Sequence, residues 1–318
     1  MLEVALDGDT VGRIDETLAG LSDVNEDIKL NFGNHWPEDG HEVALLAAAL
    51  IGSLRDRKVT VDVDDPDAVD SLLRVGLATA LSRRANGCTT FAAAARDLNR
   101  PRLGAVWTSG SRATTEALFA AHDPATTGGF GPRYATFVNP HLSTGAEGHP
   151  DVVFLVRRWL TRRLGEALPG HAVDALVATV GASLDELIAN VQEHAAAERT
   201  PRIDCLVRVS ITTANGVRCS VSDNGRGIAD SLGSKVPSNG NANTLVSLIE
   251  GELPGWDAGR GVGLTRVRQL ARDVGGHLTI ATDRTRLLAC AGQRVQATEA
   301  SFLLRGTLVD LDLPAPQT

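Results

Sequence analysis

The stretch Asp-Glu-Leu-Ile-Ala-Asn-Val-Gln-Glu-His at residues 185–194 belongs to a longer helical pattern that decides the fold of the second half of the chain. Across residues 173–195, apolar residues recur at spacings of three and four, which predicts a helix with one buried stripe. Glu186, Asn190 and His194 are each four residues apart, so they share a second stripe, rotated away from the apolar one. A carboxylate, an amide and an imidazole are therefore expected along one edge of this helix.

A second segment, Asp-Asn-Gly-Arg-Gly-Ile, occupies residues 223–228. It follows an alternating run at residues 217–221 that is typical of a strand, so Asp223 is expected at a strand end. Gly225 and Gly227 allow backbone angles and a close approach that a Cβ atom would block. By itself the segment would also fit a surface turn, because Asp-Asn-Gly is a common turn sequence.

A third segment, Gly-Arg-Gly-Val-Gly-Leu, occupies residues 259–264 and precedes a helix expected over residues 265–274. Glycines before a helix N-terminus expose backbone N–H groups toward an anion, and the helix dipole adds a favourable potential. A flexible glycine loop would match the same letters. The segment therefore gains its meaning from the two that precede it.

Together, in this order and at this spacing, the three segments resemble the N, G1 and G2 boxes of the GHKL ATP-binding domain. Gyrases, heat-shock chaperones, mismatch-repair ATPases and histidine kinases share this domain. The resemblance covers residues 160–314 and implies a two-layer α/β sandwich, the Bergerat fold, which binds ATP with Mg²⁺. Residues 229–258, between the second and third segments, resemble the lid that closes over the nucleotide.

The resemblance also implies a role for each matching residue. Glu186 would orient or deprotonate the attacking nucleophile. Asn190 would ligate Mg²⁺ through its side-chain oxygen, and His194 would lie near the phosphates. Asp223 would accept a hydrogen bond from the exocyclic amine of adenine, and Thr307, in a closing strand expected over residues 306–314, would join the same network. The other nucleotide-binding positions implied are Gly225, Gly227, Ile228, Gly259, Gly261, Gly263 and Leu264.

The N-terminal 85 residues predict a different α/β unit. Strands are expected over residues 2–6, 27–32 and 58–63, and helices over residues 11–21 and 42–57. This order resembles a STAS-like domain, the fold of anti-sigma-factor antagonists. It departs from that family where a phosphoacceptor Ser or Thr usually stands, because residues 37–42 contain no hydroxyl. Residues 86–158, rich in Gly and Pro, are expected to connect residues 1–85 to an ATP-binding domain at residues 159–318.

Composition narrows the choice of partners and location. The chain of 318 residues has a net charge of −8, which argues against nonspecific nucleic-acid binding. Its longest apolar run, residues 43–54, is shorter than the ~20 residues that a membrane helix needs. The first residues lack the pattern of a signal peptide, and the four cysteines form no CxxC pair, which argues against a zinc site. We therefore expect a cytoplasmic protein without membrane or nucleic-acid partners.

Four activities are compatible with the three boxes. The first is a Ser/Thr protein kinase similar to anti-sigma-factor kinases, which acts on a partner protein. The second is an ATPase that drives a conformational change, and the third is an ATP sensor with little turnover. The fourth, a histidine kinase, is favoured least, because His41, His122 and His171 do not lie in the helical hairpin that a phosphoacceptor needs. A protein partner is expected in each case, and a homodimer is left open.

Overall fold

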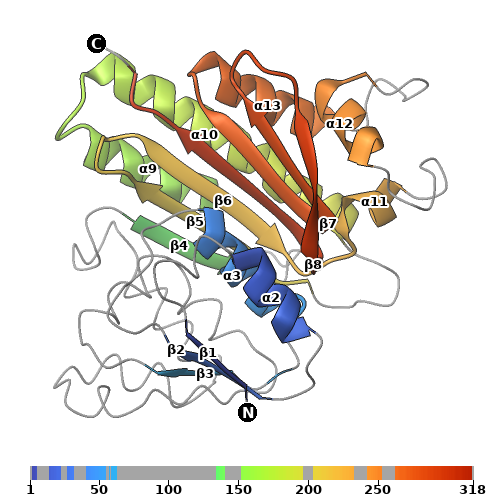
Figure 1. Cartoon of the computed structure of the whole chain (residues 1–318). Helices are drawn as coiled ribbons and strands as arrows, with labels where there is room; N and C mark the ends of the chain where they lie inside the picture. Colours follow the sequence, from blue (N-terminus) through green and yellow to red (C-terminus); the bar gives the residue numbers. More distant parts are fainter. Residues whose placement is uncertain are drawn as a thin grey trace, which may run out of the picture.

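The computed structural model describes residues 2–5, 14–22, 27–31, 41–54, 57, 59–62, 134–139, 152–195, 203–232, 242–252 and 262–316. The second half of the chain is built on a five-stranded antiparallel sheet (Figure 1). Its strands are β4 (Tyr134–Asn139), β5 (Cys205–Ile211), β6 (Val217–Asp223), β7 (His277–Cys290) and β8 (Gln296–Leu313). They lie side by side in the order β4-β5-β6-β8-β7.

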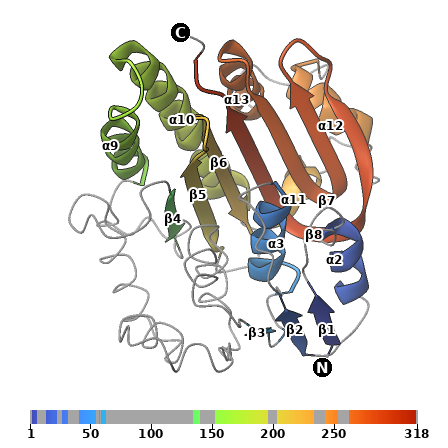
Figure 2. The same cartoon turned by 60° about the vertical axis from the view of Figure 1, so that its left-hand side comes forward.

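Helices cover one face of this sheet (Figures 1 and 2). They are α9 (Val152–Leu164), α10 (Gly170–Asn190), α11 (Gly227–Leu232), α12 (Ala242–Glu250) and α13 (Val262–Asp273). The apolar stripe predicted for α10 is buried against the sheet at Val173, Leu176, Val180, Leu184 and Leu187. The helix predicted from residue 173 is confirmed as far as Asn190, where α10 ends. The helices and the antiparallel sheet of this half are consistent with the predicted Bergerat fold.

The opposite face of the sheet is covered as well. All seven residues of β5 and six of the seven residues of β6 are buried, whereas a sheet with one face in water exposes alternate residues. Two helices from the N-terminal part, α2 (Ile14–Ser22) and α3 (His41–Ile51), pack here, with α2 against β8 and α3 against β6 and β8 (Figure 2). The sheet is therefore the central layer of a helix–sheet–helix arrangement.

The helix α3 owes its place to its composition. Every residue from Val43 to Ile51 is buried, because a helix that is apolar on all sides can be stable only inside the protein. Beyond α2 and α3 lies a small parallel sheet formed by β1 (Leu2–Ala5), β2 (Ile28–Asn31) and β3 (Val59–Asp62), in the order β1-β2-β3 (Figure 1). Within the described residues, each helix is too short or too polar to cross a bilayer.

The predicted order of strands and helices in residues 1–63 is confirmed, although α3 ends at Ile51 instead of residue 57. The likeness of this region to a STAS domain stays a prediction, as do the domain bounds at residues 85 and 158. The strand β4 lies within the segment predicted to connect the two domains, and it pairs with β5 at the edge of the large sheet.

The strand β8 contains a bulge opposite the middle of β7. Asp283 pairs with Leu304 and Thr285 pairs with Glu299, so β7 advances by two residues while β8 advances by five. The extra residues have backbone N–H and C=O groups without hydrogen-bond partners in the β7–β8 ladder. Where such a group is buried, another hydrogen-bond partner is required.

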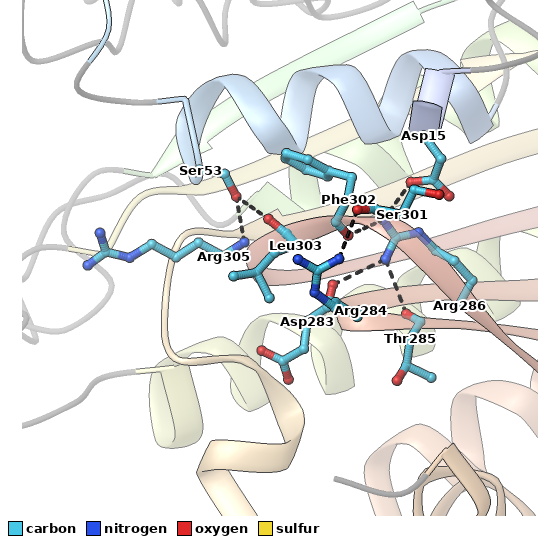
Figure 3. A network of polar contacts seen from close by, with 10 residues as sticks. All are labelled: Asp15, Ser53, Asp283, Arg284, Thr285, Arg286, Ser301, Phe302, Leu303 and Arg305. Atoms are coloured by element: carbon cyan, nitrogen blue, oxygen red, sulfur yellow. Dashed lines mark hydrogen bonds and ion pairs between the residues drawn. The ribbon is translucent and has the colours of Figure 1, made fainter. Parts of the chain in front are cut away.

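Side chains supply these partners (Figure 3). The buried Arg286 donates to a carbonyl group of the bulge, and its guanidinium also forms an ion pair with Asp15 of α2, at 2.8 Å between Nη2 and Oδ1. The bulge is thereby tied to the helices of the N-terminal part. Three of the side-chain bonds to its carbonyl groups are donated by Arg284 Nη1 to Ser301 (2.9 Å), by Arg286 Nη2 to Phe302 (3.4 Å) and by Ser53 Oγ to Leu303 (2.8 Å).

Candidate functional site

The edge of α10 that carries Glu186 and Asn190 faces the first turn of α13. A Cβ atom added to Gly263 would lie 3.1 Å from Asn190 Nδ2, 3.2 Å from Asn190 Oδ1 and 3.2 Å from Glu186 Oε2. Glycine is the residue that lets the two helices approach this closely without displacing either polar side chain. Glu186, Asn190 and Gly263 form what we call the N-box cluster.

The Asn190 amide in this cluster has spare hydrogen-bonding capacity. Its Nδ2 atom is buried and has no hydrogen-bond partner. A buried amide without a partner is costly, so it points to a ligand or water that completes it. Among the described residues there is no group of three or more His, Cys, Asp or Glu side chains that could hold a metal ion. The role of Asn190 as a Mg²⁺ ligand stays a prediction.

Glu186 has a partner that the sequence did not reveal. Arg266 of α13 donates from Nη1 to Glu186 Oε1 at 2.5 Å. The Glu186 side chain is 26% exposed and the Arg266 side chain 59% exposed, so both remain in contact with solvent. Arg266 lies three residues after Gly263, and this i, i+3 spacing places both on the same face of α13. Spacing within the predicted helix could have identified Arg266 as a neighbour of the site.

After Asn190 the α-helix gives way to one turn of π-helix, Val191–Ala195. This change alters the direction of the His194 side chain relative to a continuous α-helix. The His194 ring lies 3.7 Å from the Glu193 carboxylate, measured from Nε2 to Oε2, and is 44% exposed. The structure thus brings Glu186 and Asn190 to Gly263, while the His194 ring lies beside the carboxylate of its neighbour Glu193.

The π turn connects the N box to the G1 box. The Ala195 carbonyl accepts a hydrogen bond from the Arg226 backbone N–H at 3.1 Å, and the His194 carbonyl accepts one from Arg226 Nε at 2.8 Å. A Cβ atom on Gly225 would lie 2.4 Å from the Ala195 carbonyl oxygen, so only glycine fits there. The first glycine of the G1 box is therefore required by packing against the end of the N box.

Asp223 is the last residue of β6 and only 5% exposed. Its carboxylate accepts hydrogen bonds from the backbone N–H groups of Gly225, at 2.7 Å, and Thr307. Burial raises the pKa of Asp223 to about 7, although these two hydrogen bonds act in the opposite direction. Gly306 has a φ of +98°, and a Cβ atom there would overlap the Asp223 carbonyl oxygen. Asp223, Gly225, Gly306 and Thr307 form what we call the Asp223 cluster.

The neighbouring Asn224 is a residue that the sequence-based interpretation did not assign. It is buried, its Oδ1 accepts from the Asp204 backbone N–H at 2.9 Å, and its Nδ2 donates to the Ile51 carbonyl at 3.3 Å. Ile51 is the last residue of α3, whose final carbonyl groups have no partner within the helix. The G1 box therefore contacts the N-terminal part of the chain directly.

Gly227 and Ile228 lie against β7. Gly227 has a φ of +78°, and a Cβ atom there would lie 3.0 Å from Thr282 Oγ1 and 3.1 Å from Asp283 Oδ2. The Ile228 N–H donates to Thr282 Oγ1 at 3.0 Å. Burial, followed by the charge of Asp230, raises the pKa of Asp283 to about 6. No motif in the sequence pointed to Thr282 and Asp283.

The remaining predicted positions divide into two groups. Leu264 is half-buried and packs against the core on the α10 side of the sheet. Gly259 and Gly261 lie outside the described residues. Within the predicted lid, residues 229–258, the structure describes the helix α12, Ala242–Glu250.

Comparison with known proteins adds an independent finding. Residues 179–317 match the family model described as "Histidine kinase-, DNA gyrase B-, and HSP90-like ATPase". A search of the curated proteins finds no match. The match contains Glu186, Asn190 and Asp223, so the chain has a GHKL-type ATP-binding domain at residues 179–317.

Two solved structures are similar to the chain, both from Erythrobacter litoralis EL346. One is a blue-light activated histidine kinase, at 22% identity over 46% of this chain and 32% of that chain, with a TM-score of 0.27. The other is the histidine kinase domain of the same kinase, at 19% identity over 50% of this chain and 65% of that chain, with a TM-score of 0.28. The chain therefore spans about a third of the first structure and just under two thirds of the second.

Proposed function

We propose that this chain, whose residues 179–317 form a GHKL-type ATP-binding domain, is an ATP- and Mg²⁺-dependent kinase that phosphorylates Ser or Thr on a partner protein. The observation that carries the proposal is the N-box cluster, in which Glu186 and Asn190 converge on Gly263. A base and a metal ligand thereby stand together at the start of a helix whose dipole favours phosphate. We further propose a cytoplasmic location and leave a homodimer open.

The Asp223 cluster is suited to adenine. A buried carboxylate held by two backbone N–H groups can accept a further hydrogen bond from the exocyclic amine, and losing such a bond in a buried site is costly. Thr307 stands opposite Asp223 in the β6–β8 ladder and has a hydroxyl to offer to the same base. ATP would thus extend from the Asp223 cluster to the N-box cluster, past the Ala195–Gly225 contact.

The residues present also fit Mg²⁺. Asn190 offers a hard oxygen ligand in its Oδ1 atom, and its Nδ2, a buried donor without a protein partner, could donate to a phosphate oxygen beside the ion. When bound, the ion would neutralise charge on the phosphate oxygens. In phosphoryl transfer, the Ser or Thr oxygen bonds to the γ-phosphorus while the bond from that phosphorus to the β–γ bridging oxygen breaks. ADP then leaves with the bridging oxygen, and Glu186 accepts the hydroxyl proton.

One observation favours a second candidate, an ATP-dependent conformational switch that turns over slowly or not at all. Arg266 holds one oxygen of Glu186, so part of the proposed base is engaged before any substrate binds. An arrangement of this kind limits turnover until the guanidinium finds another anion. A hydrolysing ATPase would use the same residues, with water in place of the hydroxyl.

Purified full-length chain with γ-labelled ATP and an array of Ser- and Thr-containing peptides separates these activities. Acid-stable label on peptides supports the proposed kinase. Acid-labile label on the chain itself would instead indicate a histidine kinase, and free phosphate alone an ATPase. Calorimetric binding of ATP without any turnover would support the sensor, whereas absence of ATP binding would contradict the whole proposal.

The raised pKa of Asp223 predicts that adenine-nucleotide affinity depends on pH. With a pKa of about 7, the carboxylate is mostly ionised at pH 8 and mostly protonated at pH 6, and only the ionised form is a full acceptor for the amine. We expect the Kd for ATP to rise about tenfold from pH 8 to pH 6. Asp223→Asn cannot titrate, so the pH dependence that remains in this variant belongs to the nucleotide phosphates and is subtracted. Equal pH profiles for both proteins, measured by calorimetry, would contradict the assignment.

A further inference from the structure

The Ser53 hydroxyl is a bridge between the N-terminal part of the chain and the strand that carries Thr307. Ser53 Oγ donates to the Leu303 carbonyl at 2.8 Å and accepts from the Arg305 backbone N–H at 2.7 Å (Figure 3). Both partners belong to the bulged part of β8, which the β7 ladder does not hold in regular register. Ser53 thus takes the place of a missing ladder partner just before Gly306 and Thr307.

The packing around this bridge leaves little room for movement. A Cβ atom on Gly52 would lie within 2.4 Å of the Arg305 carbonyl oxygen, so α3 ends in direct contact with β8. On the other side of the strand, Gly306 is in contact with the Asp223 backbone, at a distance that also excludes a Cβ atom. A displacement of Arg305 would therefore be passed to Asp223, because packed interiors transmit strain.

A second connection reaches the Asp223 cluster from the same end of α3. Asn224, in the G1 box, donates from Nδ2 to the Ile51 carbonyl at 3.3 Å, and both residues are buried. This bond satisfies a carbonyl group at the C-terminus of α3 that has no partner in the helix. Residues 51–53 thus contact the Asp223 cluster through β8 and through the G1 box.

We propose that Ser53, together with Ile51 and Gly52, is a positioning element of the adenine side of the site. The end of α3 holds Arg305 and Asn224 in place, and these in turn fix Thr307 and Asp223. The inference rests on the proposed function, since it takes the Asp223 cluster as the adenine site. It adds that the N-terminal part of the chain completes this site, so that nucleotide affinity depends on how that part is docked.

Linkage makes the effect reciprocal. If docking of residues 51–53 strengthens nucleotide binding, then bound nucleotide must strengthen the docking by the same factor. The backbone N–H groups of Gly52 and Leu54, which donate to Ala48 and Ala49, report on this end of α3. We expect their hydrogen exchange to slow when ADP is added to the unmodified chain.

The main test compares three variants of the full-length chain by calorimetry with ATP and with ADP. Ser53→Ala removes the bridge, and we expect the Kd for both nucleotides to rise by the same factor, about 3- to 10-fold. Ser53→Thr keeps the hydroxyl and should bind as the unmodified chain does. Ser301→Ala is the matched control, because it lies exposed on the same strand and contributes its carbonyl, not its hydroxyl, to the Arg284 contact.

The possible outcomes distinguish failure of this inference from failure of the proposed function. If the unmodified chain binds ATP and ADP but Ser53→Ala binds them equally well, the inference is wrong and the proposed function stands. A loss confined to ATP would place the effect on the phosphates and would also overturn it, as would unchanged exchange at Gly52 and Leu54. If the unmodified chain binds neither nucleotide, both the proposed function and this inference are wrong. Should Ser53→Ala not fold, the exchange experiment on the unmodified chain still decides.

Discussion

Glu186→Gln is expected to bind ATP with nearly unchanged affinity and to lose phosphoryl transfer by about 10²- to 10⁴-fold, the usual contribution of a general base. Glutamine keeps the shape of the side chain and can still lie beside Gly263, but its amide cannot accept the proton. The measurement pairs calorimetry with single-turnover transfer of label from ATP. The substitution removes the proposed base while leaving Asn190 and the Asp223 cluster intact.

Asp185→Asn is the matched control for this variant. Asp185 is the neighbouring carboxylate on α10, but it points to Arg157 of α9, with 3.4 Å between Oδ2 and Nη2, and it is exposed. Neutralising it should change transfer less than twofold, because surface ion pairs contribute little. If Glu186→Gln kept full activity, or if both variants lost it equally, Glu186 would have no part in the chemistry.

Asn190→Ala is expected to weaken ATP binding in the presence of Mg²⁺ by about 100-fold or more. Even residues behind a metal ligand typically account for 10- to 100-fold in metal affinity, and Asn190 is the proposed ligand itself. Binding measured in EDTA should change far less, because the adenine contacts are untouched. Calorimetric titrations of ATP with and without Mg²⁺ give both numbers from one preparation.

Gln192→Ala provides the comparison for this loss, since Gln192 carries the same amide, stands two residues further along and is exposed on the π turn. It should bind ATP as the unmodified chain does under both conditions. Equal loss of affinity with and without Mg²⁺ in Asn190→Ala would show that the amide supports the fold or contacts the phosphates, and does not ligate the metal.

The N box shows how far sequence periodicity reaches. The spacing of apolar residues predicted α10 and its buried stripe correctly, and it placed Glu186 and Asn190 on one edge. The same spacing put His194 on that edge only if the α-helix continued. It does not, because Ala195 is held by Arg226 and packed against Gly225, and these contacts lie about thirty residues away in sequence. Local periodicity carries no information about such a tertiary constraint.

The β7–β8 hairpin was predicted only in part. A closing strand was expected over residues 306–314, whereas β8 begins at Gln296 and pairs with β7, which extends from His277 to Cys290. The missing part starts where the register shifts, between Thr282 and Asp283, and a bulge breaks the alternation on which strand prediction depends. Arg284 and Arg286 donate hydrogen bonds to backbone carbonyl groups in this part. Such contacts produce no periodic pattern in the sequence.

The position of the N-terminal helices could not have been predicted either. The composition of α3 indicates that it is buried on all sides, but it does not indicate what buries it. The answer lies in pairs of residues far apart in the chain, such as Asp15 with Arg286 and Ile51 with Asn224. No single-sequence pattern links positions separated by more than 170 residues.

Because both faces of the large sheet are buried, few fragments of the chain are expected to be soluble. A fragment that begins near residue 150 would keep all three boxes, yet it would leave Phe302, Leu304 and Leu308 in contact with water, and Arg286 without its carboxylate partner. Exposed apolar patches of this kind promote aggregation. Expression of the ATP-binding half alone is therefore expected to give inclusion bodies. A soluble fragment would need the leading sixty residues, or polar side chains in place of the apolar residues that become exposed.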